Sequence, residues 1–230
     1  MRHLLKTFLA AWVFGTGVGL ADTHPVVVEL YTSQGCSSCP PADELLHELA
    51  DRDDVIALAL HVDYWDYIGW KDSFADPTHT QRQRAYARAA GSRAIYTPQM
   101  IIGGKDHVIG TKPMQVADLL RMHSNQTPEV EITLQRNGDR IVVEAASKMP
   151  QPMIVQLVRY NPQAEVSIKR GENAGRTLSY ANIVTEWRVL TEWDGETPLL
   201  TTEAIEGEAP IVVIVQRSGH KEILAADRIR

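Results

Sequence analysis

Cys36 and Cys39 are the only two cysteines among the 230 residues of this sequence, and they stand three positions apart. This spacing permits a disulfide, and it also lets the second thiol attack a mixed disulfide made by the first. A bridge that closes so short a loop stabilises a fold weakly, because loop-closure stabilisation grows with loop length. The spacing therefore favours redox chemistry over a purely structural bridge.

The cysteine pair stands between a predicted strand and a predicted helix. Residues 26–31, VVVELY, form a short apolar and β-branched run that is typical of a buried strand. From Pro41 the sequence PADELLHELA predicts a helix, with prolines in its first turn and acids close behind. A cysteine at a helix N-terminus faces free backbone N–H groups and the positive end of the dipole, which favour the reactive thiolate.

Further elements follow in an alternating order. A second apolar run at residues 55–62 predicts a parallel βαβ unit with a right-handed crossover. The patterns after it predict a helix from Asp76-Pro77 to Gly91, a strand hairpin around Gly103-Gly104, and a helix that opens at Pro113. From residue 128 the sequence alternates apolar and polar residues, with a hairpin signal at Asn137-Gly138. We therefore predict an α/β domain over residues 22–127, followed by an all-β, sandwich-like domain over residues 128–230.

The first 21 residues have the pattern of a secretory signal peptide. Arg2 and Lys6 give a basic start, residues 7–20 carry no charge, and Gly19 and Ala21 suit a cleavage site. An uncleaved anchor is the alternative, but the run is shorter than the roughly 18–20 residues that a spanning helix needs. We expect a periplasmic or secreted protein, away from the membrane after cleavage, in a compartment where disulfides persist.

The charge balance excludes one class of partner. The chain holds 23 Lys and Arg against 29 Asp and Glu, for a net charge of −6, and its basic residues form no cluster. Nucleic-acid binding depends on clustered basic side chains that contact phosphates. We expect no nucleic-acid partner.

Several stretches resemble known families. The strand at 26–31, the Cys-Ser-Ser-Cys at the head of a helix and Tyr96-Thr97-Pro98 ahead of a hairpin resemble the thioredoxin-like superfamily over residues 25–124. A closer resemblance, over nearly the whole mature chain, is to the DUF1223 family of exported bacterial proteins. The stretches that carry it are ELYTSQGCSSCPPAD, HVDYWDYIGWKDSFA, TQRQRAYA, YTPQMIIGG and GENAGRTLSYANIV.

The resemblance implies roles for individual residues. Cys36 would attack a substrate and Cys39 would resolve the mixed disulfide, which agrees with an exposed position before the helix for Cys36 and a covered one for Cys39. Thr97 and Pro98 would form a cis-proline loop that docks the extended backbone of a substrate. Thioredoxins also carry a buried acid in the strand before the pair, and Glu29 is the acid available here.

Glu29 is an imperfect match to that acid. It stands one place from the usual register, and one place in a strand changes the face. Glu29 is therefore either a proton relay or an ordinary polar partner, with Asp63 and Asp66 as rival relays. In the aromatic segment at residues 63–75, Tyr64 and Trp65 are candidates for a substrate groove, with packing under a loop as the alternative.

The sequence thus predicts an exported thiol–disulfide oxidoreductase. Its substrate would be a thiol or disulfide, either a protein or a glutathione-like molecule, and an unidentified redox partner would reset the pair. We expect no cofactor and no metal. Two alternatives stay open: a copper- or metal-handling protein with Cys36 and Cys39 as ligands, and a non-catalytic binding module.

Overall fold

A computed structural model describes residues 24–230, so the predicted signal peptide at residues 1–21 lies outside the described part of the chain. The first elements along the chain are β1 (Val26–Thr32), α1 (Pro40–Ala50), β2 (Val55–His61), the 3₁₀ turn η1 (Asp66–Ile68), α2 (Pro77–Ala89), β3 (Gln99–Ile102), β4 (Asp106–Ile109) and α3 (Pro113–Ser124). The remaining elements are β5 (Val130–Asn137), β6 (Arg140–Ser147), β7 (Met153–Ser167), β8 (Thr177–Trp193), β9 (Leu199–Ala204), β10 (Ile211–Arg217) and β11 (Ile223–Ile229). None of the helices formed by these residues is long and apolar enough to cross a membrane.

The fold is mostly β, and the prediction of an α/β thioredoxin-like domain followed by an all-β domain is wrong. Strands from both parts of the sequence join in one mixed eight-stranded sheet of order β11-β10-β7-β8-β2-β1-β3-β4, and β5-β6-β9 form a second sheet. The two parts meet where β8 runs parallel to β2, through the bridge of Ala59 with Ile183. The alternation of apolar and polar residues that begins near residue 128 is a local pattern, and it carries no information about such a distant pairing. The boundaries at residues 127 and 128 themselves stay a prediction.

The first four strands position the cysteine pair. β1 lies parallel to β2 and antiparallel to β3, and β4 pairs with β3. One face of β1 packs through Val28 and Leu30 against α1 and α3, whereas Val27 and Tyr31 face a second core that includes Tyr86 of α2. Alternate residues of a strand point to opposite faces, so α1 and α2 lie on opposite sides of the sheet.

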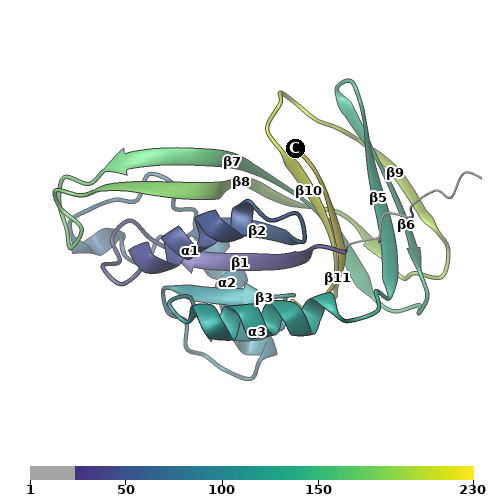
Figure 1. Ribbon diagram of the computed structural model, residues 1–230. Coiled ribbons are helices and arrows are strands. Elements are labelled where there is room, and N and C mark those ends of the chain that lie inside the picture. The colour runs from purple at the N-terminus through teal and green to yellow at the C-terminus, as the bar shows by residue number, and fades with distance from the viewer. Residues whose placement is uncertain (1–23) are drawn as a thin grey trace, which may run out of the picture.

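The strands β7 and β8 form a long hairpin of 15 and 17 residues. In Figure 1 the turn of this hairpin and the beginning of α1 lie at the same end of the molecule. Along the seam with β2, Asn182 has a positive φ of 47° and donates its side-chain amide to the carbonyl of Ala57 at 2.9 Å. The side chain thus supplements the single backbone bridge between the two parts of the sheet.

The three-stranded sheet of β5, β6 and β9 lies at the other end of the molecule from the β7–β8 turn (Figure 1). The hairpin predicted at Asn137-Gly138 is confirmed, since β5 and β6 pair in register from Val130 with Ser147 to Asn137 with Arg140. Its apolar residues share one core with β7, β10 and β11, including Ile141, Leu157 and Val213. Figure 1 shows these strands beside β10 and β11, away from the turn of the β7–β8 hairpin.

Candidate functional site

Cys36 and Cys39 form a disulfide at the N-terminus of α1, with an Sγ–Sγ distance of 2.12 Å and a Cα–Cα distance of 5.4 Å. Cys39 is the N-cap residue of the helix, and its carbonyl accepts hydrogen bonds from the amides of Ala42 and Asp43. Both cysteines are 0% exposed. The greater exposure expected for Cys36 is therefore absent, because another part of the chain covers it.

Asp43 lies directly behind the disulfide on the same helix. It follows Cys39 by four positions, a spacing that places both side chains on one helix face. The carboxyl group is 5% exposed and accepts a hydrogen bond from Thr32 Oγ1 at 2.7 Å. Burial raises the pKa of Asp43 to about 7, against the lowering influence of His61 and of the Thr32 hydrogen bond. Asp43 can therefore take up or release a proton near neutral pH, and its spacing from Cys39 was the sequence signal for it.

A buried His–Asp pair lies beneath the loop that carries the cysteines. The Nδ1 of His61 and Oδ2 of Asp72 are 2.7 Å apart, and neither side chain is exposed. Oδ2 of Asp72 also accepts the backbone amide of Gln34 at 2.8 Å. Burial alone would raise the pKa of Asp72, but His61 and these hydrogen bonds hold the pKa below its usual value.

Two polar atoms of this region are unusual. Within the described part of the chain, His61 Nε2 and the Tyr180 hydroxyl are buried without a hydrogen-bond partner. The Tyr180 and His61 rings are in edge contact, with centroids 4.9 Å apart. Burial first, and then the nearby Asp43 and Asp72 carboxyl groups, raise the pKa of Tyr180, which keeps the phenol neutral. The loop that carries the cysteines, residues 33–39 and below called the cysteine loop, thus packs on a buried cluster of titratable side chains.

The cis-proline loop predicted at Thr97 and Pro98 faces the same helix. The Thr97–Pro98 peptide bond is cis, and Pro98 is buried. A Cβ at Gly110 would lie 2.8 Å from the Ala42 Cβ of α1 and 3.2 Å from the Pro98 Cβ. Only glycine fits between them, so the proline ring and the first turn of α1 lie close together.

Both aromatic candidates, Tyr64 and Trp65, contact this loop through Thr97. Trp65 Nε1 donates to Thr97 Oγ1 at 2.8 Å, and its Cβ lies 3.3 Å from where a Gly35 Cβ would stand. Tyr64 donates its hydroxyl to Gln83 of α2 at 3.2 Å, and a side-chain hydrogen bond with Thr97 also acts on this hydroxyl. Both side chains are half-buried and pack against the core. The structure thus brings Trp65, Thr97 and the cysteine loop together.

Glu29, the predicted proton relay, lies on the opposite face of the sheet from α1. It accepts two hydrogen bonds from the Arg82 guanidinium, at 2.7 and 2.9 Å, and one each from the hydroxyl groups of Tyr31 and Tyr86. Burial would raise the pKa of Glu29, but Arg82 and these hydrogen bonds lower it. Glu29 is held as an anion, and this arrangement matches the polar partner named as its alternative role. The rival candidate Asp63 is bound by Thr80, and Asp66 accepts the backbone amide of Asp72.

Asn173 is a site residue that the sequence did not reveal. It lies in the turn between β7 and β8, within the stretch GENAGRTLSYANIV, and it is 1% exposed. Its side-chain amide donates to the carbonyl oxygens of Gln34 at 2.9 Å and Cys36 at 3.0 Å. The sequence offers no signal for this contact, because the partners are more than 130 positions apart.

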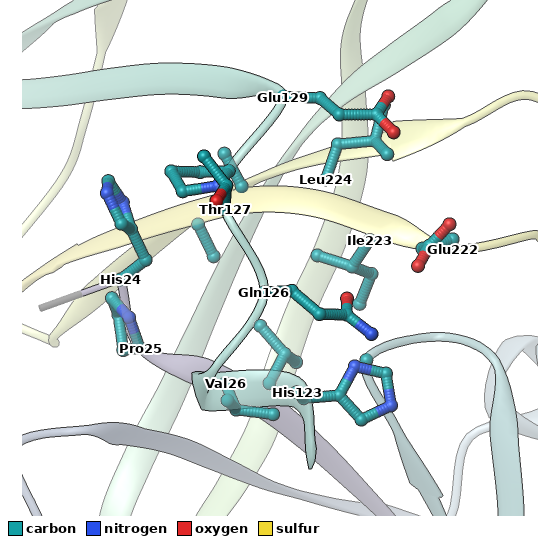
Figure 2. Close-up of a pocket in the computed structure, with 15 residues that line it drawn as sticks. His24, Pro25, Val26, His123, Gln126, Thr127, Glu129, Glu222, Ile223 and Leu224 are labelled. Carbon is teal, nitrogen blue, oxygen red and sulfur yellow. The ribbon is translucent and has the colours of Figure 1, made fainter. Parts of the chain in front are cut away.

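A separate cavity of about 90 Å³ opens at the far end of β1, and Figure 2 shows how His24, His123, Gln126 and Glu129 lie around it. The cavity is lined by Val26, the first residue of β1, whereas the cysteine loop follows Thr32 at the other end of the strand. Seven residues of strand span roughly 20 Å, so this cavity is distinct from the disulfide site. Over residues 24–230, no group of three or more His, Cys, Asp or Glu side chains is arranged to hold a metal ion.

Comparison with known proteins identifies relatives by sequence and structure. The crystal structure of protein AGR_C_4864 from Agrobacterium tumefaciens is 32% identical, with a TM-score of 0.77 over 89% of this chain and 93% of that chain. The crystal structure of wild-type OgpA from Akkermansia muciniphila is 12% identical over 73% of this chain and 40% of that chain. Its TM-score of 0.28 is too low to indicate a shared fold. No curated protein matches. Residues 27–216 match the family described as a protein of unknown function, DUF1223. The chain therefore belongs to the DUF1223 family.

Proposed function

We propose that this protein is an exported thiol–disulfide oxidoreductase that works through Cys36 and Cys39. One observation carries the proposal: the two cysteines of the chain form a disulfide at a helix N-terminus, and Asp43 behind them has a pKa of about 7. The helix N-terminus favours thiolates, which are the reacting species. A carboxyl group with a pKa near the ambient pH suits general acid–base catalysis.

The exchange proceeds in two balanced steps. In the reductive direction the Cys36 thiolate attacks one sulfur of a substrate disulfide, which forms a mixed disulfide and releases a substrate thiolate. Cys39 then gives its proton to Asp43, and its thiolate attacks Cys36 Sγ. The Cys36–Cys39 bond forms, the mixed disulfide breaks, and the second substrate sulfur leaves as a thiolate. The substrate gains two electrons, the pair loses two, and the same steps run backwards for oxidation.

The arrangement around the pair supports a relation to the thioredoxin-like superfamily at the level of the site. The cis bond before Pro98, its position beside α1 and the hydrogen bond from Trp65 to Thr97 are compatible with docking of an extended substrate at this loop. In this proposal Thr97 and Pro98 contact the substrate backbone, and Trp65 holds Thr97 in place.

The proposed function also includes a compartment, a class of substrate and a redox partner. The pattern of residues 1–21 supports export, and an oxidising compartment suits a working disulfide. The substrate is a thiol or disulfide compound, and a separate redox protein resets the pair after each turnover. Detection of the mature protein in the periplasmic or culture fraction, starting near residue 22, tests the location.

The central test is the reduction potential of the pair, measured by equilibration with glutathione buffers and trapping of thiols. We expect a reversible two-electron couple between roughly −270 and −120 mV, the range of known exchange proteins. A pair that glutathione cannot reduce would contradict the proposal. Metal bound to protein purified under reducing conditions would instead support the metal-handling alternative.

A further inference from the structure

The turn that joins β7 to β8 binds the loop that carries the disulfide. We define the hairpin tip as residues 168–176, IKRGENAGR. At its centre the Asn173 amide donates to the carbonyl oxygens of Gln34 and Cys36, and Asn173 Oδ1 accepts from the Arg176 guanidinium at 3.0 Å. Asn173 is buried, while the residues on either side of it are exposed. Ile168 and Asn173 are the two buried residues of the tip, and the Asn173 side chain is the one that is hydrogen-bonded to the cysteine loop.

Two further contacts fix the tip just before Asn173. The Glu172 carboxylate accepts the backbone amide of Ser37 at 3.3 Å. Gly171 has a φ of 78°, and a Cβ there would stand 3.2 Å from the Trp70 Cβ. Trp70 in turn donates to the Gln34 side chain at 2.8 Å. The tip therefore packs on both the cysteine loop and the aromatic segment.

This packing has a chemical consequence. A thiolate must approach a disulfide sulfur directly, so exchange depends on access to the sulfur atoms. Both cysteines are fully buried, and the tip is hydrogen-bonded to the loop that carries them. A small thiol needs only a slight opening of the tip, whereas a folded protein needs the whole turn to move away. The size of the opening therefore sets the size of the partner.

Resting on the oxidoreductase function proposed above, we propose that the hairpin tip restricts the Cys36–Cys39 pair to small-molecule thiols and disulfides, and that Asn173 is the residue that keeps it closed. In the measured reaction, one thiolate attacks Cys36 Sγ and releases the Cys39 thiolate. A second thiol molecule then displaces Cys36, which yields its own disulfide and the reduced pair. Asn173 contacts neither reacting sulfur in this scheme and acts as a positioning residue.

The test compares two thiols that differ in size. The probes are 2-mercaptoethanol and a thiol-terminated polyethylene glycol of the size of a small protein. The rate of reduction of the oxidised protein by each probe is followed by acid quench and thiol trapping. Asn173→Ala removes both hydrogen bonds to the cysteine loop, and Asn173→Asp keeps the shape but replaces the donor by a carboxylate. Asn161→Ala, at an exposed asparagine of β7 in the same hairpin, is the control.

We expect the wild-type protein to react with the small thiol at least tenfold faster than with the large one. Loss of two hydrogen bonds of about 1 kcal/mol each corresponds to about a 30-fold gain in opening. Asn173→Ala and Asn173→Asp should therefore speed reduction by the large thiol about 30-fold and by the small thiol much less, while Asn161→Ala changes neither rate. A size ratio that stays at its wild-type value in both variants would overturn the proposal.

The failure of this inference is distinguishable from failure of the proposed function. The function is tested by the wild-type protein alone, through its reaction with the small thiol. The role of the tip is tested by the ratio between the two probes across the variants. If the Cys36–Cys39 disulfide of the Asn173 variants reacts with neither probe, the proposed role of the tip is also refuted, because loss of the Asn173 contacts would then give no access to the sulfur atoms. Urea unfolding of each variant confirms that the fold is retained.

Discussion

Replacing Asp43 by asparagine is expected to stabilise the oxidised protein at alkaline pH and to leave its stability at acid pH unchanged. Burial raises the pKa of Asp43 from 3.8 to about 7 in the folded chain. Between these two values the folded state keeps a proton that the unfolded state has released, so the free energy of unfolding falls as the pH rises. An asparagine does not titrate, and its Oδ1 can still accept the Thr32 hydrogen bond.

The size of the effect follows from the pKa difference. The two states differ by about 3 pKa units, and each unit corresponds to about 1.4 kcal/mol. The ionised carboxylate therefore lowers the free energy of unfolding by about 4 kcal/mol above pH 7. Asp43→Asn should recover about that amount at pH 8, progressively less as the pH falls from 7, and nothing below pH 4.

Urea unfolding of the disulfide-intact protein from pH 4 to pH 8 measures this directly. Glu44→Gln is the matched control, because Glu44 is the exposed neighbour of Asp43 on the same helix. Its stability profile should follow that of the wild-type protein. An Asp43→Asn variant that gains as much at pH 4 as at pH 8, or gains nothing at either, would refute the assignment of a raised pKa to this carboxyl group.

Other perturbations test the disulfide and the far face of the sheet. Cys39→Ser should accumulate a mixed disulfide on Cys36 with its substrate, detectable by mass spectrometry, because the resolving thiol is missing; its absence would count against the proposed order of attack. Reduction of the disulfide should lower the free energy of unfolding by about 2 kcal/mol, the loop-closure value for so short a ring; a loss above twice that size would mark it as a structural bridge. Glu29→Gln should cost about 3–5 kcal/mol in urea unfolding because it leaves a buried Arg82 charge unpaired; a loss below about 1 kcal/mol, the scale of exposed pairs, would contradict that reading.

Local features of the fold could be predicted from the sequence. The strand at residues 26–31, the helix after the prolines and the hairpin at Asn137-Gly138 are confirmed because each depends on residues close together in the chain. The parallel partner β1 of β2 was predicted, but its second partner, β8, could not be. The apolar residues of β2 predict a buried strand but do not say that β8, more than 100 positions later, will lie beside it.

The site shows the same division. The cysteine spacing and its place before a helix were readable, and so was a proline loop at Thr97 and Pro98. Asp43 was read as an acid near the helix dipole, because the sequence does not show that Thr32 and the core will bury it. Asn173 lay beyond prediction, since its contact depends on the length and direction of the β7–β8 hairpin.

The hairpin tip also sets an order of events during synthesis. Asn173 follows Cys36 by 137 residues along the chain. A ribosome that adds 5–20 residues per second needs roughly 7–27 s to make that length. For that interval the cysteine pair has been made and the hairpin tip has not. The finished fold can therefore close over the cysteine pair only after the β7–β8 hairpin has been made, and a disulfide that forms before that closure needs no opening of the tip.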